Sequence, residues 1–298
     1  MTGEPAGVGD ETGPTSALPR VLRIFGTIIA PTTLLTAVCY YFGWMFSYWF
    51  FDYFGVNSTL LGLAPSDYLI RAVDGLFVPM TVLGCISLLA LWGHVLLRTH
   101  IAGPRRHLLR VLVPLIAVVG LVLAFAGLAS VFTTTVLTRH LAAAPISLAV
   151  GVLLLEYAVT LQRTHNTTAW TAVAEWAALF VLVGVSLFWA ATDYAGAVGR
   201  TRAYQFAREL PTYPETILYS RQSLSLRMPG VQEMRCQAVD AAYRFRYDGL
   251  KLVLQSGGQY LLLPEQWTPA DGAAVLLPRD NSLRLEFTRA GAPTPKAC

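Results

Sequence analysis

Charged residues are scarce in this sequence, and their scarcity excludes an ordinary water-soluble protein. Only 13% of the 298 residues are charged, while 54% are apolar, whereas a soluble globular domain carries about 25% charged residues. A surface that faces water everywhere cannot be built from so few charges. We therefore expect most of the chain to face lipid.

Catalytic signatures are also lacking. The sequence contains no HExxH, GxSxG, CxxC, SxxK or Walker motif. It has only two lysines against twenty arginines, a bias that a GC-rich genome explains better than nucleic-acid binding. We expect no catalytic residue, no metal site, no cofactor and no nucleic-acid partner.

Long uncharged runs, in contrast, are abundant. A helix needs about 20 residues to cross a hydrocarbon core about 30 Å thick, and five apolar segments reach that length. We predict an α-helical membrane bundle of five transmembrane helices. The spans are residues 21–44, 75–97, 111–132, 141–161 and 170–191.

The charges that remain crowd after Asp193 and divide the chain. Residues 1–19 are rich in Gly, Pro and Thr, which indicates a disordered tail, and they lack the charged start of a cleavable signal. A transmembrane domain, a stalk, a small all-β domain and a tail are predicted to follow. These regions are residues 20–193, 194–213, 214–288 and 289–298.

Arginines are distributed unequally over the short loops, and positively charged loops tend to stay in the cytoplasm. With the N-terminus inside, the inner side holds seven arginines, and the two short outer loops hold only Arg71 and Arg139. Three arginines after the fifth span argue weakly for the reverse, although long domains translocate largely regardless of charge. We expect a multi-pass protein of the cell membrane with a cytoplasmic N-terminus and an extracytoplasmic C-terminal domain.

Eleven of the fifteen residues from Tyr40 to Phe54 are aromatic. Tyr and Trp are favoured at a membrane boundary, because the ring lies among the headgroups while its OH or NH reaches water. We interpret this stretch as an interfacial belt that follows the first span along the membrane surface. An aromatic pocket or pore lining is the alternative. The belt residues are Tyr40, Tyr41, Trp44, Tyr48, Trp49 and Tyr53.

Small residues recur every four positions in the third and fourth spans, so these two helices are expected to approach closely. Such packing fits a compact bundle, although a homo-oligomeric pore would show the same pattern in one chain. The positions are Gly120, Ala124, Ala143, Ser147 and Gly151.

After residue 214, apolar residues alternate with polar ones, which is the period of a strand with one buried face. The runs begin at Leu224, Tyr243 and Leu283. Asp248-Gly249, between YRFRY and LKLVLQ, is predicted to close a hairpin, because a type I′ turn needs positive φ at both positions. Further turns are expected at Gly257-Gly258 and Asp280-Asn281. We predict six or seven short antiparallel strands that form a barrel or a sandwich.

Several stretches carry a resemblance to known proteins. YYFGW, YFGV and SDYLIR after the first span, together with YRFRYDGLKLVLQSGGQYLLLPEQWTPADG, are similar to an uncharacterised group of multi-pass membrane proteins from high-GC Gram-positive bacteria. The resemblance covers residues 20–288. It implies the architecture, and because that group has no established activity it implies no chemistry.

Three titratable residues lie inside the predicted spans, at a similar depth near the inner boundary. They are His94, Glu156 and Glu175. A charge within a span is costly, so these side chains should face the bundle interior and find partners there. A hydrogen-bonded pin between helices is one interpretation, and a proton or cation relay is the other.

Two cysteines lie outside the spans, Cys236 and Cys298. An extracytoplasmic β domain would permit a disulfide bridge between them, whereas a free thiol at the last residue is the alternative. Cys39 and Cys85 lie within spans and are expected to serve as small apolar residues.

These patterns leave three hypotheses for function. The first is a non-enzymatic envelope protein whose β domain binds a protein partner or a small ligand, with the bundle as anchor or relay. The second is an ion or proton pathway that uses the acidic residues of the spans. The third is a membrane enzyme that acts on lipid or cell-wall precursors, and the lack of a catalytic motif disfavours it.

Overall fold

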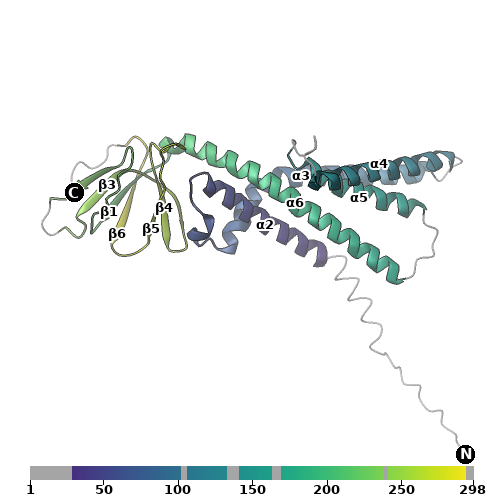
Figure 1. Cartoon of the computed structure of the whole chain (residues 1–298), viewed down its shortest axis with the longest axis horizontal. Helices are drawn as coiled ribbons and strands as arrows, with labels where there is room; N and C mark the ends of the chain where they lie inside the picture. The colour runs from purple at the N-terminus through teal and green to yellow at the C-terminus, as the bar shows by residue number, and fades with distance from the viewer. Residues whose placement is uncertain (1–28, 102–105, 133–140, 163–168, 238–240, 293–298) are drawn as a thin grey trace, which may run out of the picture. The chain divides into compact units, whose positions relative to one another are not determined.

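The computed structural model describes residues 29–101, 106–132, 141–162, 169–237 and 241–292 (Figure 1). Residues 39–298 form one compact unit, separate from residues 1–38. The contacts reported below lie within the larger unit. In chain order, its helices come first and its strands follow.

Within the described ranges, five helices are long and apolar enough to cross a membrane. They are α2 Ala30–Asp52, α3 Pro65–Ile101, α4 Arg106–Phe132, α5 Ala143–Gln162 and α6 Ala169–Glu209. Each predicted span overlaps one of them, so the number and order of the apolar helices are confirmed. Two short 3₁₀ helices, η3 Ser58–Leu61 and η5 Leu210–Thr212, follow α2 and α6.

Helices α2 and α6 extend well past the C-terminal ends of their predicted spans, and α3 begins at Pro65, before its predicted start at residue 75. The aromatic stretch does not form a separate segment after the first span, because α2 continues without a break to Asp52. Helix α6 likewise continues through most of the residues predicted as a stalk and ends at Glu209. The last turns of α2 and α6 therefore lie beyond the apolar runs that predict the spans.

Helices α4 and α5 pack with their backbones close together, as the small-residue pattern predicts. A Cβ atom added at Gly151 would lie 2.4 Å from the backbone nitrogen of Ala124, and one added at Gly120 would lie 3.0 Å from the carbonyl oxygen of Gly151. No larger side chain fits at these positions without separating the helices. The predicted close packing of these two spans is therefore confirmed.

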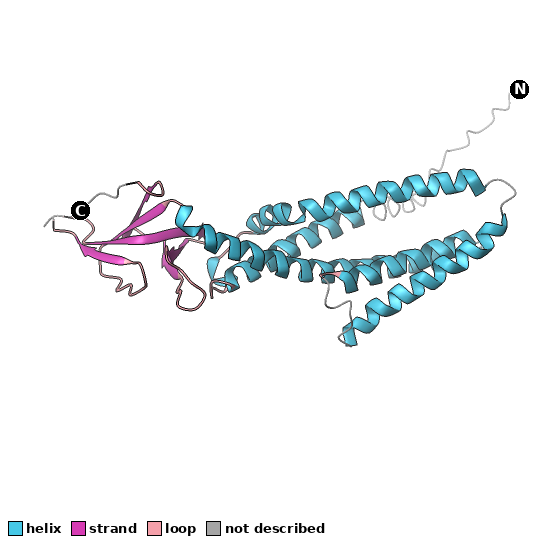
Figure 2. Ribbon diagram, turned by 90° about the horizontal axis from the view of Figure 1, so that it is seen from above, coloured by secondary structure: helices cyan, strands magenta, loops and turns pink. Residues whose placement is uncertain are grey.

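Figure 2 shows the strands in magenta. They form one antiparallel sheet of six strands in the order β5-β4-β3-β1-β6, with β2 also paired to β3. Its core is a cluster of Leu218, Tyr247, Leu250, Leu262 and Leu277. The structure thus confirms a C-terminal antiparallel β region, while its type, barrel or sandwich, stays a prediction. The strands are β1 Glu215–Ser220, β2 Gln232–Arg235, β3 Phe245–Ser256, β4 Gln259–Pro264, β5 Val275–Pro278 and β6 Leu283–Thr288.

The predicted hairpin at Asp248-Gly249 is wrong, because these residues lie inside the continuous strand β3. Between the pairs Thr216–Leu250 and Leu218–Tyr247 the strand β3 has one residue more than β1, so the dipeptide forms a β-bulge. Gly249 has a φ of 82°, and a Cβ atom there would lie 2.1 Å from the carbonyl oxygen of Gly230. Gly249 therefore permits a β-bulge and the close approach of the Gly230 backbone, and it does not form a turn.

The other two predicted turns are present. Gly257 and Gly258 have φ values of 56° and 74° and connect β3 to its antiparallel neighbour β4, so this hairpin is confirmed. The turn at Asp280 connects β5 to β6, two strands at opposite ends of the sheet order. The carboxylate of Asp280 accepts hydrogen bonds from Ser282, and these bonds lower the pKa of that carboxyl.

The alternating run from Leu224 to Met228 is not a strand, although its apolar side chains face the core as the alternation predicts. Leu224, Leu226 and Met228 pack against the sheet core from a segment without regular structure. The hydroxyl of Tyr247 accepts a hydrogen bond of 2.6 Å from the backbone nitrogen of Leu224. Burial raises the pKa of this phenol, which therefore stays neutral while it holds the segment against the core.

Candidate functional site

Aromatic side chains join the sheet to the ends of the long helices. Trp267, in the turn after β4, is 7% exposed, and its ring centroid lies 4.8 Å from that of Phe54 and 5.6 Å from that of Tyr53. Phe206 of α6 packs against both Phe54 and Tyr213. We call these five residues the aromatic junction.

The indole of Trp267 is held by packing rather than by its polar atom. Its Nε1 is buried and has no hydrogen-bond partner among the described residues. A Cβ atom added at Gly272 would lie 2.4 Å from this nitrogen, so the backbone after the turn lies directly against the ring. Buried donors in native proteins are rarely left in this state. The ring therefore contributes its shape and apolar area at this position, and no hydrogen bond to a described residue.

A second contact joins the β3–β4 hairpin to the segment before α3. A Cβ atom at Gly257 would lie 2.5 Å from the carbonyl oxygen of Leu61 and 2.8 Å from Cα of Gly62. Gly62 also has a φ of 56°. At this point two glycines let the two backbones touch, and a larger residue at either position would push the hairpin away.

Asp67 serves both sides of this hairpin contact. Its Oδ2 accepts a hydrogen bond of 3.0 Å from the backbone nitrogen of Ala64, which satisfies a donor at the start of α3. The same oxygen accepts a longer hydrogen bond, of 3.4 Å, from the hydroxyl of Ser256 in β3. One carboxylate therefore caps the helix and contacts the strand.

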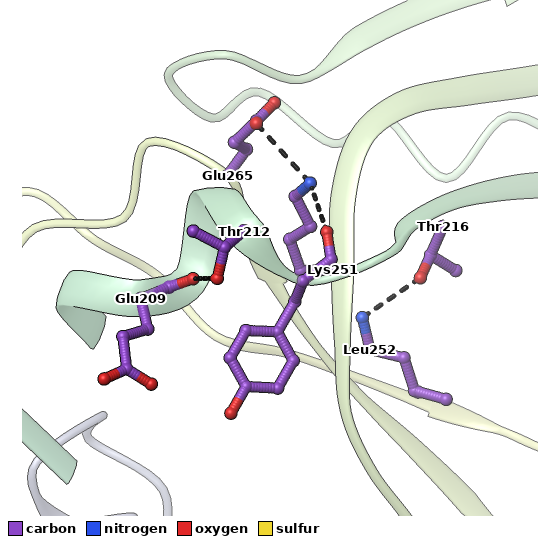
Figure 3. A network of polar contacts seen from close by, with 7 residues as sticks. Glu209, Thr212, Thr216, Lys251, Leu252 and Glu265 are labelled. Carbon is purple, nitrogen blue, oxygen red and sulfur yellow. Dashed lines mark hydrogen bonds and ion pairs between the residues drawn. The ribbon is translucent and has the colours of Figure 1, made fainter. Parts of the chain in front are cut away.

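A buried lysine makes the third contact between sheet and helix end (Figure 3). Lys251 of β3 is 2% exposed, and its Nζ donates a hydrogen bond of 2.9 Å to the carbonyl oxygen of Tyr213. The carboxylate of Glu265 lies 3.4 Å from the same nitrogen. A buried ammonium is tolerated only with such partners, so this group fixes where the chain after α6 meets the sheet.

The residues predicted as an aromatic belt lie on two sides of α2. Tyr40, Trp44 and Tyr48 follow one another at intervals of four and are 40%, 37% and 37% exposed, which suits a boundary with lipid. Two others contact α6 instead: the hydroxyl of Tyr41 lies 3.1 Å from that of Thr192, and Trp49 lies under the guanidinium of Arg200. Tyr53 belongs to the aromatic junction.

The phenylalanines of the same stretch form a separate, buried row. Phe42, Phe46 and Phe50 are also spaced by four, are at most 9% exposed and stack in sequence. One row of this helix thus consists of exposed Tyr and Trp, and another consists of buried Phe. The interfacial location of the outward row stays a prediction.

Two titratable residues of the spans, His94 and Glu156, have partners of different kinds. Nδ1 of His94 lies 2.8 Å from the hydroxyl of Tyr157, which links α3 to α5. Glu156, the neighbour of Tyr157 in the chain, accepts a hydrogen bond from Thr160. A joint cluster of His94, Glu156 and Glu175 stays a prediction. Within the described ranges, no three His, Cys, Asp or Glu residues are grouped so that they could hold a metal ion.

Only one cysteine of the predicted disulfide, Cys236, lies among the described residues. Cys236 is disulfide-bonded, while Cys39 and Cys85 are free. Cys298 lies outside the described residues, so its pairing with Cys236 stays a prediction.

Two residues of the site were not singled out by the sequence. Trp267 stands among turn residues in EQWTPADG, and such a tryptophan outside any apolar run is a usable signal for a contact with another element. Lys251 is one of only two lysines and stands between Leu250 and Leu252. Alternation assigns it to the face opposite these leucines, but it does not tell that the chain after α6 covers that face.

Comparisons of the chain with models of protein families, with curated proteins and with solved structures find no match. The resemblance to a membrane protein group noted from the sequence therefore gains no support from them.

Proposed function

We propose that this protein is a non-enzymatic, multi-pass protein of the cell membrane. Its β domain lies outside the cytoplasm and binds an envelope protein or a small ligand, and its helices serve as anchor and relay. The membrane part of the proposal is supported by five helices of spanning length and apolar character.

The observation that carries the relay is the set of three contacts between the sheet and the helix ends. Trp267 packs on the end of α2, Gly257 touches the segment before α3, and Lys251 bonds to Tyr213 after α6. A ligand that displaces the sheet would move these contacts with it. Packed contacts of this kind can carry coupling between two sites, and a flexible tether would not provide them.

The location of the sheet can be tested by fusions to alkaline phosphatase, which is active only outside the cytoplasm. A fusion after Thr288 is expected to be active, and a fusion within residues 101–107 is expected to be inactive, because arginine-rich loops stay inside. The matched control is the same pair of sites fused to a reporter that is active only in the cytoplasm, which should give the opposite pattern. Activity of alkaline phosphatase only at residues 101–107 would place the sheet in the cytoplasm.

The binding role can be tested at strand β6, an end of the sheet order. Among the described residues of the β domain, Phe287 is the large apolar side chain that is most exposed, at 57%. An edge strand with an exposed aromatic residue is a ready surface for a partner. A photoreactive phenylalanine at position 287 is expected to form a discrete cross-linked product in whole cells. The same residue at position 226, which faces the sheet core, should not.

Two results would argue against a protein partner at this domain. One is equal labelling at positions 287 and 226. The other is the lack of a product at position 287 and also at the exposed positions 221 and 244. A small ligand would then be the remaining form of the binding proposal. It would be detected as a shift in the thermal unfolding of the full chain in the presence of that compound.

A proton or cation pathway is the second candidate, and the bond between His94 and Tyr157 favours it, because this is a titratable pair inside the apolar helices. Glu156→Gln and Glu175→Gln separate a relay from a pin, since the amides preserve most of the shape and remove the titration. We expect lowered thermal stability with unchanged proton flux in proteoliposomes. A lost flux in variants that fold normally would instead establish the pathway.

A further inference from the structure

A groove lies beside the C-terminal part of α6. It has a volume of about 320 Å³, and its described lining consists of Leu141, which precedes α5, and one face of α6. The residues from α6 are Ala197, Val198, Thr201, Arg202 and Gln205. Their spacing of four places them on successive turns of one side of the helix.

The polarity of this groove changes along the helix. Ala197 and Val198 line its end nearer to the apolar part of α6, and Leu141 adds a further apolar side chain to the lining. Thr201, Arg202 and Gln205 line the end nearer to Glu209, about 6 to 12 Å further along at the rise of an α-helix. An apolar end followed by a polar end is the order of an amphiphile that lies with its chain toward the membrane core. This order does not depend on which side of the membrane the sheet occupies.

Arg202 supplies the charge at the polar end. Its side chain is 50% exposed, and its contacts are an ion pair of 3.4 Å with Asp74 and a hydrogen bond of 3.5 Å to Gln205. Both distances are long for a guanidinium, and the group carries five N–H donors. Donors therefore remain for a phosphate, which arginine binds well with two parallel hydrogen bonds. The hydroxyl of Thr201 is already bonded to the carbonyl oxygen of Ala197.

Asp74 decides which headgroup fits. Its carboxylate is 69% exposed beside Arg202, so the polar end presents one positive and one negative group and no net charge. A zwitterionic headgroup with a primary ammonium complements both groups, whereas an anionic headgroup would face the carboxylate with a like charge.

We propose that this groove binds one phospholipid of the phosphatidylethanolamine class. Its phosphate lies on Arg202, its ammonium lies on Asp74, and the first carbons of an acyl chain lie against Leu141, Ala197 and Val198. The lipid would seal α6 against the start of α5 at the level where α6 leaves the apolar part of the bundle.

The test is native mass spectrometry of the full chain, purified in detergent and mixed with dioleoylphosphatidylethanolamine. We expect one lipid adduct on the wild type and about tenfold less on Arg202→Gln, as for the loss of a hydrogen-bonded charge. Ala197→Phe fills the apolar end without changing charge and is expected to lower the adduct similarly. Arg227→Gln removes an exposed arginine of the β domain and should retain the adduct.

Three results would overturn the proposal. Equal adducts on all variants, or an equal loss in Arg202→Gln and Arg227→Gln, would mean that the lipid does not use this groove. A stronger adduct with dioleoylphosphatidylglycerol would contradict the headgroup assignment. A second copy of the chain that binds the wild type and is lost in Ala197→Phe would show that the groove is a protein interface instead.

Discussion

Replacing Trp267 with alanine is expected to lower the free energy of unfolding of the full chain by about 3 to 5 kcal/mol, the usual effect of removing a large buried aromatic ring. The ring is 7% exposed and packs on Tyr53 and Phe54 at the end of α2. Nothing in the described part of the chain accepts a hydrogen bond from its Nε1. The loss is therefore one of packing alone, and thermal unfolding in detergent measures it.

A conservative variant separates the ring from its polar atom. Trp267→Phe keeps an aromatic ring and removes the buried Nε1–H, so it is expected to retain most of the stability that the alanine variant loses. The matched control is Phe287→Ala, which removes an exposed ring from the same sheet and should change the stability by less than about 0.5 kcal/mol.

The same variants test the relay by amide hydrogen exchange. If the sheet and the helix ends form one cooperative region, Trp267→Ala should speed exchange in residues 46–54 and 203–212 as well as in the turn that contains it. Faster exchange in that turn alone would mean that the sheet is only tethered to the helices. The helices would then serve only as a membrane anchor, and their proposed role as a relay would be refuted.

The apolar helices could be predicted from the sequence because their signal is long and local. An uncharged run of about 20 residues has few structural solutions. The limits of the runs did not give the ends of the helices, however. Helix α2 ends at Asp52 and α6 ends at Glu209, and both continue with polar and aromatic residues beyond the predicted spans. A helix ends where its capping and packing end, not where its contact with lipid ends.

Period-two patterns predicted burial better than strand pairing. Leu224 faces the core as expected, yet its backbone nitrogen donates a hydrogen bond to the Tyr247 hydroxyl rather than to a neighbouring strand. The positive φ expected at Gly249 is present, but it serves a bulge, because β1 and β4 both hold β3 as one strand. Alternation reports which face is covered, whereas pairing depends on residues far away in the chain.

The contacts of the candidate site could not be predicted from the sequence, because each joins segments that are distant in the chain. Asp67 and Ser256, or Phe54 and Trp267, share no local pattern that would link them. Only the kind of residue hinted at a role: a tryptophan among turn residues, and a rare lysine between leucines.

Replacing Lys251 with glutamate is expected to destabilise the sheet by about 3 to 5 kcal/mol, the usual effect of an uncompensated buried charge. The ammonium of Lys251 lies between the carbonyl oxygen of Tyr213 and the carboxylate of Glu265. A carboxylate in its place would face two acceptors and repel Glu265. Lys251→Met is the matched control at the same position. It should cost less, about 1 to 3 kcal/mol, because it leaves the carbonyl oxygen of Tyr213 without a partner but buries no charge.

The pH dependence distinguishes a charge effect from a steric one. Burial beside Glu265 raises the pKa of the new carboxyl above its value of about 4.3 in the unfolded chain. Its destabilising effect is therefore absent below that pH and grows as the pH rises toward the raised pKa of the folded state. Below the raised pKa the neutral acid can donate a hydrogen bond to the carbonyl oxygen of Tyr213. The gap in stability between the Glu and Met variants should thus close as the pH falls, measured by thermal unfolding between pH 4 and 8. A gap of constant size would show that shape, not charge, makes Lys251 necessary at the meeting point of β3 and the chain after α6.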